Sequence, residues 1–429
     1  MKKNKDMTIA DIHNLFLKST GISTDTRSLQ KGNLFIALSG ENFNGNKFAQ
    51  QAEEKGAIAV IIDDINYQSP KSILVDDTLN TLQNLANFHR NQLNIPIIAL
   101  TGSNGKTTTK ELINAVLSKK YNTTATKGNL NNHIGVPLTL LSMDKSTEIG
   151  IVEMGANNFK EIETLARIAA PDYGYITNFG KAHLEGFGDI NGVIKAKTEL
   201  YEYLRNNKKT VFINADNDTQ LEKAKEIKQY TFSEQKNTNC NISFTEANPN
   251  VIVNYNTTTI KSNLIGSYNF SNIAAAISIG THFNVNSSAI KEAIENYTPT
   301  NNRSQILIKE SNKIILDAYN ANPTSMMAAL ENFNKLSAKN KVLFIGDMFE
   351  LGKEAQEEHQ KIVDYITQSK ISDCYILGEN FKKTTHSKNI QSYNNFEALK
   401  AVFKENIKNS TILIKGSRGM ALERILDIL

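Results

Sequence analysis

Tryptophan is absent from this chain of 429 residues, and cysteine is almost absent, with two residues. Cys240 and Cys374 lie far apart in the sequence, and neither belongs to a C-x-x-C pair. This pattern indicates neither a disulfide framework nor a zinc site. We predict that both cysteines are unreactive packing residues.

Long hydrophobic runs are missing as well. No apolar run approaches the roughly 20 residues that a helix needs to cross a bilayer, so membrane insertion is not expected. The basic start, Met1 to Lys5, leads into acidic and polar residues and not into the apolar stretch of a secretory signal. We therefore expect a cytoplasmic protein.

An excess of charge of one sign is also lacking. The net charge is +4, with lysines and acidic residues interleaved, and no basic block alternates with aromatic residues. A nucleic-acid partner is therefore not expected. The fractions of hydrophobic residues, 40%, and charged residues, 21%, are typical of a globular protein. The length indicates about three domains.

The most informative segment runs from Ile97 to Thr109, where a short apolar strand leads into a glycine-bounded turn and then a helix. Gly102 and Gly105 let the backbone turn with its N–H groups exposed. Lys106 offers a charge to phosphate oxygens, and Thr107 offers a hydroxyl to Mg²⁺. The segment is a shortened variant of the phosphate-binding loop and predicts a nucleoside triphosphate ligand. An incidental glycine-rich turn would leave the strand, the helix and the Lys/Thr run unexplained.

Short strands alternate with helical patterns along most of the chain, which predicts an α/β fold with parallel sheets. We predict three domains: a small N-terminal α/β domain at residues 1–88, a central phosphate-loop domain at 89–298 and a Rossmann-like C-terminal domain at 299–429. The polar stretch from Glu234 to Asn263 alternates like an antiparallel appendage or exposed hairpin. We assign it no chemistry.

Two more polar residues follow predicted strands of the central domain. Glu153 ends the strand that begins at Ile149, at the carboxyl edge where open parallel sheets bind ligands. A carboxylate there can hold Mg²⁺, and a helix-capping or solvated glutamate is the alternative. His183 follows the next strand in a glycine-rich loop, which favours a metal or phosphate role about as much as a structural one.

Two other segments are ambiguous by themselves. Lys197 begins a predicted amphipathic helix, and by itself it is predicted to be a surface lysine. A carbamate formed on it with CO₂ would offer two oxygens to Mg²⁺, but nothing in the spacing suggests one. The run from Asp317 to Pro323 closes a strand and precedes a helix predicted at 324–336, where it could line a ribose or base. A simple Asx/Pro helix entry would explain only Asn322 and Pro323.

Together these motifs resemble those of the Mur ligase family, the ATP-dependent amide ligases of peptidoglycan precursor synthesis, over essentially the whole chain. The phosphate loop, Glu153, His183 and Lys197 match positions that Mur ligases share with folylpolyglutamate synthetases. The runs His183–Gly188, Asp317–Pro323 and Gly346–Met348 look like the members that add D-alanyl-D-alanine. The other matching motifs are Thr24–Arg27, Leu34–Leu38, Gly128–Pro137, Gly266–Asn272, Asn302–Ser304, Met348–Gly352 and Lys415–Arg418.

One segment departs from the family pattern. Asn44–Phe48 stands where the family usually has Asp-Gly-His before the phenylalanine. The departure puts details of the nucleotide-sugar contact in doubt and leaves the family resemblance intact.

The resemblance implies a role for each matching position. The catalytic residues would be Lys106, Glu153, His183 and Lys197. ATP would be bound by Gly102, Ser103, Asn104, Gly105, Lys106, Thr107, Thr108, Asn269, Arg303, Asp317 and Asn322. The UDP-linked substrate would be held by Thr24, Asp25, Thr26, Arg27, Asn129, Asn131 and Asn132. Two Mg²⁺ ions would be bound by Thr107, Glu153, His183 and Lys197, with Lys197 carbamylated.

The resemblance also implies the reaction. The C-terminal carboxylate of UDP-MurNAc-tripeptide would attack the γ-phosphate of ATP and form an acyl phosphate. The amine of D-alanyl-D-alanine would then displace phosphate, giving UDP-MurNAc-pentapeptide and ADP. The C-terminal domain would close over ATP and bind the incoming dipeptide, and the protein would be a monomer.

Three other interpretations remain open at this point. A sister ligase that adds another amino acid would share the central site, and the run Tyr319–Pro323 argues against it. A nucleotide-binding regulator without turnover would have no chemical need for Lys106, Glu153, His183 and Lys197 together. A purely structural protein is the weakest alternative, because polar groups gathered at strand ends serve no packing purpose.

Overall fold

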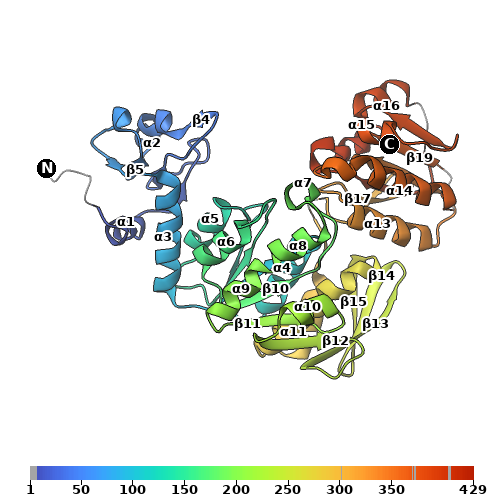
Figure 1. The fold of residues 1–429 in the computed structure, drawn as a ribbon, viewed down its shortest axis with the longest axis horizontal. Coiled ribbons are helices and arrows are strands. Elements are labelled where there is room, and N and C mark those ends of the chain that lie inside the picture. The colour runs from blue at the N-terminus through green and yellow to red at the C-terminus, as the bar shows by residue number, and fades with distance from the viewer. Residues whose placement is uncertain (1–6, 301, 370, 372, 404–406) are drawn as a thin grey trace.

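The structure is a computed structural model that describes residues 7–300, 302–369, 371, 373–403 and 407–429. The basic start of the chain, Met1 to Lys5, lies outside these residues. Three bodies follow one another along the chain, each built on its own sheet, and we call them the N-terminal, central and C-terminal bodies (Figure 1). The N-terminal and C-terminal bodies lie on opposite sides of the central one.

The N-terminal body contains a four-stranded parallel sheet in the order β1-β2-β5-β6. Alternate residues of β2 enter two hydrophobic clusters: Leu34 and Ile36 pack with α1 and α3, and Phe35 packs with α2. A two-stranded hairpin, β3-β4, projects beside the sheet. The elements are α1 (Ile9–Phe16), β1 (Ile22–Ser23), β2 (Leu34–Ile36), β3 (Ser39–Gly40), β4 (Phe43–Asn44), α2 (Ala49–Glu54), β5 (Ala59–Ile62) and β6 (Ser72–Leu74).

One long helix, α3 (Thr78–Leu93), joins the N-terminal body to the central one. It begins after Asp77, which accepts a hydrogen bond from the Asn80 N–H, and it ends at Asn94 in a left-handed conformation. The helix packs against α1 on one side and against two helices of the central body on the other. Residue 88, the predicted domain boundary, therefore lies inside a shared helix. The division of the chain into functional domains stays a prediction.

The central body has a nine-stranded sheet in the order β15-β14-β13-β12-β11-β10-β7-β9-β8. All pairs from β13 to β8 are parallel, as predicted for this part of the chain. The strands are β7 (Ile97–Thr101), β8 (Thr123–Ala125), β9 (Ile149–Glu153), β10 (Tyr173–Ile176), β11 (Thr210–Asn214), β12 (Lys228–Ser233), β13 (Cys240–Ala247), β14 (Asn250–Tyr255) and β15 (Thr258–Ile265).

The polar segment predicted to be antiparallel is confirmed as such, because β13, β14 and β15 pair antiparallel. It is not an appendage, however. Residues Phe232 and Ser233 of β12 pair parallel with Cys240 and Asn241 of β13, so the three strands extend the central sheet.

Helices cover both faces of the central sheet. In β7, Ile98 and Leu100 face a cluster with α4 and α11, whereas Ile97 and Ala99 face a cluster with α5, α6 and α9. This alternation explains why the strand reads as a continuous apolar run. The helices are α4 (Lys106–Leu117), α5 (Gly135–Leu141), α6 (Glu161–Ala169), α7 (Leu184–Phe187), α8 (Ile190–Lys197), α9 (Glu199–Asn206), α10 (Asp218–Lys223), α11 (Phe270–His282) and α12 (Ser287–Asn296).

The C-terminal body contains a six-stranded sheet in the order β16-β17-β21-β18-β19-β20. Its strands pair parallel except for the edge strand β16, which agrees with the predicted Rossmann-like unit. The elements are β16 (Gln305–Lys309), β17 (Asn312–Asp317), α13 (Pro323–Lys335), β18 (Lys341–Gly346), α14 (Ala355–Gln368), β19 (Asp373–Leu377), α15 (Glu379–Lys382), β20 (Ile390–Tyr393), α16 (Phe396–Val402) and β21 (Thr411–Lys415).

Both cysteines are buried and form no disulfide, as predicted. Burial raises the pKa of Cys240 to about 11 and raises that of Cys374 as well, which suits inert thiols. Among the described residues, no helix combines the length and the apolar character needed to cross a membrane.

Two buried histidines connect the N-terminal body to the central one. Nε2 of His89 lies 2.8 Å from the Met143 carbonyl oxygen and therefore donates its proton there. Nδ1 of His89 is then an acceptor, and Nε2 of His13 donates to it over 3.0 Å. The His89 ring is therefore neutral, because one of its nitrogens donates and the other accepts. Burial lowers the pKa of both, and for His89 the Met143 carbonyl and Asp144 oppose the shift.

The histidine pair predicts that helix α1 loosens in acid. The unfolded chain binds protons on histidine near pH 6.5, whereas the buried pair does not, so stability is complete above that pH and falls below it. At pH 5.5 the opening free energy of α1 should therefore be lower than at pH 7.5, because a histidine released by the opening binds a proton there. Hydrogen exchange of the α1 amides at pH 7.5 and 5.5, corrected for intrinsic rates, measures this loss. The variant His13→Gln should show a smaller pH dependence, and an equal one would contradict the assignment.

Candidate functional site

A tight loop, Gly102–Gly105, connects β7 to α4, and the predicted strand-loop-helix order is confirmed. Gly102 has φ +144°, and a Cβ there would lie 2.0 Å from the Thr177 hydroxyl oxygen. Gly105 has φ +79°, and its Cβ would lie 2.7 Å from Oδ1 of Asn272. Only glycine fits these two positions. The loop thus exposes backbone N–H groups at the positive end of α4, which favours an anion.

Lys106 is the first residue of α4 and is half-buried. Its Nζ donates to the carbonyl oxygens of Gly102, at 2.7 Å, and Ser103, at 3.4 Å. Burial lowers the pKa of Lys106, and Arg303 lowers it further, whereas Glu153 raises it. The ammonium is held over the loop, where phosphate oxygens would meet it.

Glu153 ends β9 as a buried carboxylate, 1% exposed. Its Oε2 accepts a hydrogen bond from the Thr107 hydroxyl at 2.9 Å, and its Oε1 accepts one from Nδ2 of Asn131 at 2.9 Å. A capping or solvated glutamate, the alternative that the sequence left open, is therefore wrong. The pair of Thr107 and Glu153 presents oxygen ligands beside the phosphate loop.

A cavity of about 590 Å³ opens between the central and C-terminal bodies at the carboxyl ends of their strands. It gathers fifteen of the residues predicted for the site, from both bodies. They are Ser103, Asn104, Gly105, Lys106, Thr107, Thr108, Asn129, Asn131, Asn132, Glu153, His183, Asn269, Arg303, Asp317 and Asn322. Asn129, Asn131 and Asn132, predicted for the UDP-linked substrate, thus lie beside the phosphate loop.

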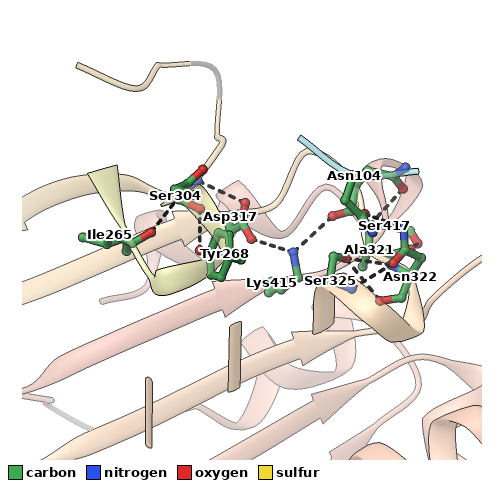
Figure 2. Close-up of polar contacts among 12 residues, drawn as sticks. Asn104, Ile265, Tyr268, Ser304, Asp317, Ala321, Asn322, Ser325, Lys415 and Ser417 are labelled. Carbon is green, nitrogen blue, oxygen red and sulfur yellow. Dashed lines mark hydrogen bonds and ion pairs between the residues drawn. The ribbon is translucent and has the colours of Figure 1, made fainter. Parts of the chain in front are cut away.

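Asp317 ends β17 with both carboxylate oxygens engaged (Figure 2). Its Oδ1 accepts from the Ser304 N–H at 3.0 Å, and its Oδ2 lies 2.5 Å from Nζ of Lys415. The Ser304 hydroxyl contacts the Tyr268 hydroxyl, at 3.1 Å, so the network continues into the central body. Asp317 is therefore held in a fixed orientation at the wall of the cavity.

Asn322 has two functions in this structure. Its side-chain oxygen caps α13 by accepting from the Ser325 N–H, as the Asx/Pro helix entry predicted. Its Nδ2 also donates to Oδ1 of Asn104 in the phosphate loop, at 2.7 Å (Figure 2). The same residue therefore caps a helix and joins the two bodies.

Two other predicted nucleotide residues lie at the seam of the bodies. The guanidinium of Arg303 stacks on the ring of Tyr319, 3.7 Å from its centroid. The Asn269 side chain is occupied internally: it donates to the Ile265 carbonyl and accepts from Asn272, each at 2.8 Å. Arg303 is thus placed to contact a ligand, whereas Asn269 mainly supports the start of α11.

His183 stands just before the short helix α7 in a left-handed conformation, with φ +53°. Its Nδ1 contacts the Oε2 carboxylate oxygen of Glu350, a residue of the C-terminal body. The ring lines the cavity. Among the described residues, no group of three or more histidine, cysteine or acidic side chains is arranged to hold a metal ion by itself.

The structure corrects the prediction for Lys197. It ends α8 and does not begin a helix, and it is fully buried, not a surface lysine. Its Nζ donates to the Ala156 carbonyl at 3.2 Å and lies 5.1 Å from the ring centroid of Phe187, and no ion pair of Lys197 is found in the described chain. Burial, together with the charge of Lys106, lowers its pKa to about 7. Lys197 is not among the cavity-lining residues.

The remaining predicted residues lie elsewhere. Thr24–Arg27 belongs to the N-terminal body and does not line the cavity. The exposed Arg27 donates to Asp25, which lowers the pKa of Asp25 to about 2. Near this loop, the residue that replaces the family's histidine, Asn46, is buried and donates to Asp63 at 2.7 Å. Its Nδ2 also donates to Oδ1 of Asn44 at 2.9 Å, so Asn46 connects the β3-β4 hairpin to the loop after β5.

Sequence reasoning assigned no role to several cavity residues, and three of these make contacts that position the site. Lys415 lies directly opposite Asp317 in the pairing of β21 with β17, a register that the sequence does not reveal. Asn178 follows β10 and accepts from the Asn104 N–H at 3.0 Å. Glu350 follows β18 and reaches His183. All three could have been found from the sequence, because each is a polar residue that ends or follows a predicted strand.

Three family models match consecutive parts of the chain. "Mur ligase family, catalytic domain" matches residues 18–98, "Mur ligase middle domain" matches 100–280 and "Mur ligase, glutamate ligase domain" matches 302–418. Together they cover most of each of the three bodies.

Individual proteins similar to this chain belong to the same family as the matching models. The UDP-N-acetylmuramoyl-tripeptide--D-alanyl-D-alanine ligase of Bacillus subtilis is 36% identical over 95% of this chain and 92% of its own length. A crystal structure of MurF from Acinetobacter baumannii matches with a TM-score of 0.84 and 26% identity, over 96% of this chain and 97% of that one. MurF from Thermotoga maritima, solved in complex with ADP, matches with a TM-score of 0.84 and 25% identity over the same shares.

Proposed function

The chain belongs to the Mur ligase family, and we propose that it joins D-alanyl-D-alanine to UDP-MurNAc-tripeptide at the expense of ATP. The observation that carries the proposal is the cavity in which the phosphate loop of the central body meets polar strand ends of the C-terminal body. The products are UDP-MurNAc-pentapeptide, ADP and phosphate. ATP use is supported by the ADP complex of the similar MurF structure.

The first chemical step joins two anions. The C-terminal carboxylate of the tripeptide attacks the γ-phosphate of ATP, and ADP leaves with the electron pair of the broken P–O bond. Lys106 and the N–H groups at the start of α4 counter the phosphate charge from the central body. Arg303, on the facing body, adds positive charge at the opposite wall. The product of the step is an acyl phosphate.

The second step forms the amide. The amine of the dipeptide attacks the activated carbonyl carbon, and the C–O bond to phosphate breaks. Water would hydrolyse the acyl phosphate, so the reaction needs a site that excludes it. We infer that the C-terminal body, at 299–429, closes over ATP and binds the incoming dipeptide. The hydrogen bond from Asn322 to Asn104 supports this closure.

The donor set suits Mg²⁺. Thr107 and Glu153 offer oxygen atoms, and Mg²⁺ takes few protein ligands and completes its shell with water and phosphate oxygens. We propose that these two residues hold one ion and that Glu153, His183 and a carbamylated Lys197 hold a second. Bound Mg²⁺ neutralises the phosphate charge that opposes the first step.

A carbamate on Lys197 forms when its neutral amine adds to CO₂ and releases a proton. The buried amine supports this proposal, because it has a carbonyl partner and no ion pair in the described chain. Its surroundings disfavour an ammonium, and the carbamate would exchange that charge for a negative one able to face Mg²⁺.

We assign the uridine end of the substrate to the N-terminal body, at 1–88, through Thr24, Asp25, Thr26 and Arg27. The exposed guanidinium of Arg27 supports a contact with the diphosphate. Asn129, Asn131 and Asn132 would hold the peptide end beside Glu153. Because one chain lines the whole cavity, we propose an active monomer, and the use of ATP and UDP-linked substrates favours the cytoplasm.

Product formation tests the proposed function. Purified protein with ATP and Mg²⁺ should release phosphate only when UDP-MurNAc-tripeptide and D-alanyl-D-alanine are both present, because the acyl phosphate needs both partners to turn over. Mass spectrometry should detect UDP-MurNAc-pentapeptide. Turnover with a different amino acid, and none with the dipeptide, would make the protein a sister ligase. ATP binding without any turnover would contradict a ligase function.

Lys197 gives a second test. The variant Lys197→Ala should lose turnover about 100-fold, because the metal ligand is missing, whereas Lys195→Ala on the same helix should remain active. With ¹³C-bicarbonate, wild-type protein should show a carbamate carbon signal by NMR that Lys197→Ala lacks. Unchanged activity of Lys197→Ala and no carbamate signal in the wild type would contradict the role.

A further inference from the structure

We propose that Glu350 of the C-terminal body is a positioning residue that orients the ring of His183 in the central body. The inference rests on the proposed function, which makes the shared cavity a reaction site. Both residues line that cavity, and they belong to different bodies.

Two contacts join the partners. Nδ1 of His183 meets the Oε2 carboxylate oxygen of Glu350, and the Glu185 N–H donates to the Glu350 carbonyl oxygen at 3.1 Å. A carboxylate only accepts hydrogen bonds, so Nδ1 of His183 carries the proton. In the neutral ring, Nε2 is then the nitrogen with a free lone pair. The contact therefore selects one tautomer and one ring orientation.

The backbone at both partners has an unusual conformation. His183 has φ +53° and Glu350 has φ +63°, in the left-handed region that residues other than glycine rarely adopt. Such conformations persist only where the surroundings hold them, and they gather at functional sites. Here the two residues contact each other, so both unusual conformations occur at the same contact.

The loop that carries Glu350 is fixed by the three residues before it. The buried Asp347 accepts hydrogen bonds from two backbone N–H groups at the start of α15, each at 2.9 Å. The Met348 N–H donates to Nε2 of the buried His359 at 3.0 Å. The Phe349 N–H donates to the Ser417 hydroxyl at 2.9 Å. The C-terminal body therefore presents the Glu350 carboxylate from a rigid support.

The two bodies are also joined independently of Glu350. Nζ of Lys181 lies 2.7 Å from Oε1 of Glu358. The backbone N–H of Lys181 donates to the Thr324 hydroxyl at 3.0 Å. Asn322 contacts Asn104 nearby. Removal of the Glu350 carboxylate therefore leaves the bodies in contact, and its effect should be confined to the histidine.

The experiment compares three variants. Glu350→Ala removes the acceptor, Glu350→Gln keeps an oxygen that accepts from Nδ1, and Glu357→Ala removes an exposed acid of the same body as a control. Nitrogen-15 NMR of the histidine ring reports the tautomer and surroundings of His183, with the His183 signals assigned by their loss in His183→Gln. Steady-state kinetics gives kcat and the KM for ATP.

Glu350→Ala should shift the His183 nitrogen signals and lower kcat roughly 10- to 100-fold, with the KM for ATP nearly unchanged because the phosphate loop is intact. Glu350→Gln should retain most of the activity and the wild-type signals, as should Glu357→Ala. Unchanged His183 signals in Glu350→Ala, or a Glu350→Gln variant as impaired as Glu350→Ala, would overturn the proposal. If the wild type forms no product, the proposed function fails, and the NMR comparison still decides whether Glu350 orients His183.

Discussion

Repulsion between two anions is the constraint on which the arrangement of this molecule depends. A carboxylate and a triphosphate approach each other only where positive charge and hydrogen-bond donors surround them. The chain meets this need by placing the carboxyl ends of two parallel sheets against one cavity. Lys106, at the start of α4, and Arg303, from the C-terminal body, both line this cavity. Neither body forms the site alone.

The local parts of this arrangement could be predicted from the sequence. The phosphate loop consists of consecutive residues, so its pattern is visible in the sequence. Gly102 and Gly105 cannot be replaced because of their backbone angles. The strands were visible as short apolar runs, and Glu153 and Asp317 were recognised because polar residues at strand ends mark the ligand edge of a parallel sheet. The antiparallel pairing of β13 to β15 followed from alternation, but its continuity with the central sheet did not.

The features of the site that could not be predicted depend on contacts between residues distant in sequence. The burial of Lys197 results from the packing of α8 against Ala156 and Phe187, which no helical pattern reveals. Lys415 meets Asp317 through strand register, and Glu350 meets His183 through the docking of two bodies. Asn322 illustrates both cases. Its helix cap could be predicted from the sequence, whereas its hydrogen bond to Asn104 could not.

The central claim is that the cavity activates a carboxylate by transfer of the γ-phosphate of ATP. Isotope transfer tests it most directly, with UDP-MurNAc-tripeptide whose C-terminal carboxylate carries ¹⁸O at both oxygens. An acyl phosphate places a carboxylate oxygen between carbon and phosphorus, and amide formation then breaks the C–O bond. The account therefore predicts one ¹⁸O atom in each phosphate released with the pentapeptide product. Phosphate without ¹⁸O, formed at the same rate as the amide, would contradict it.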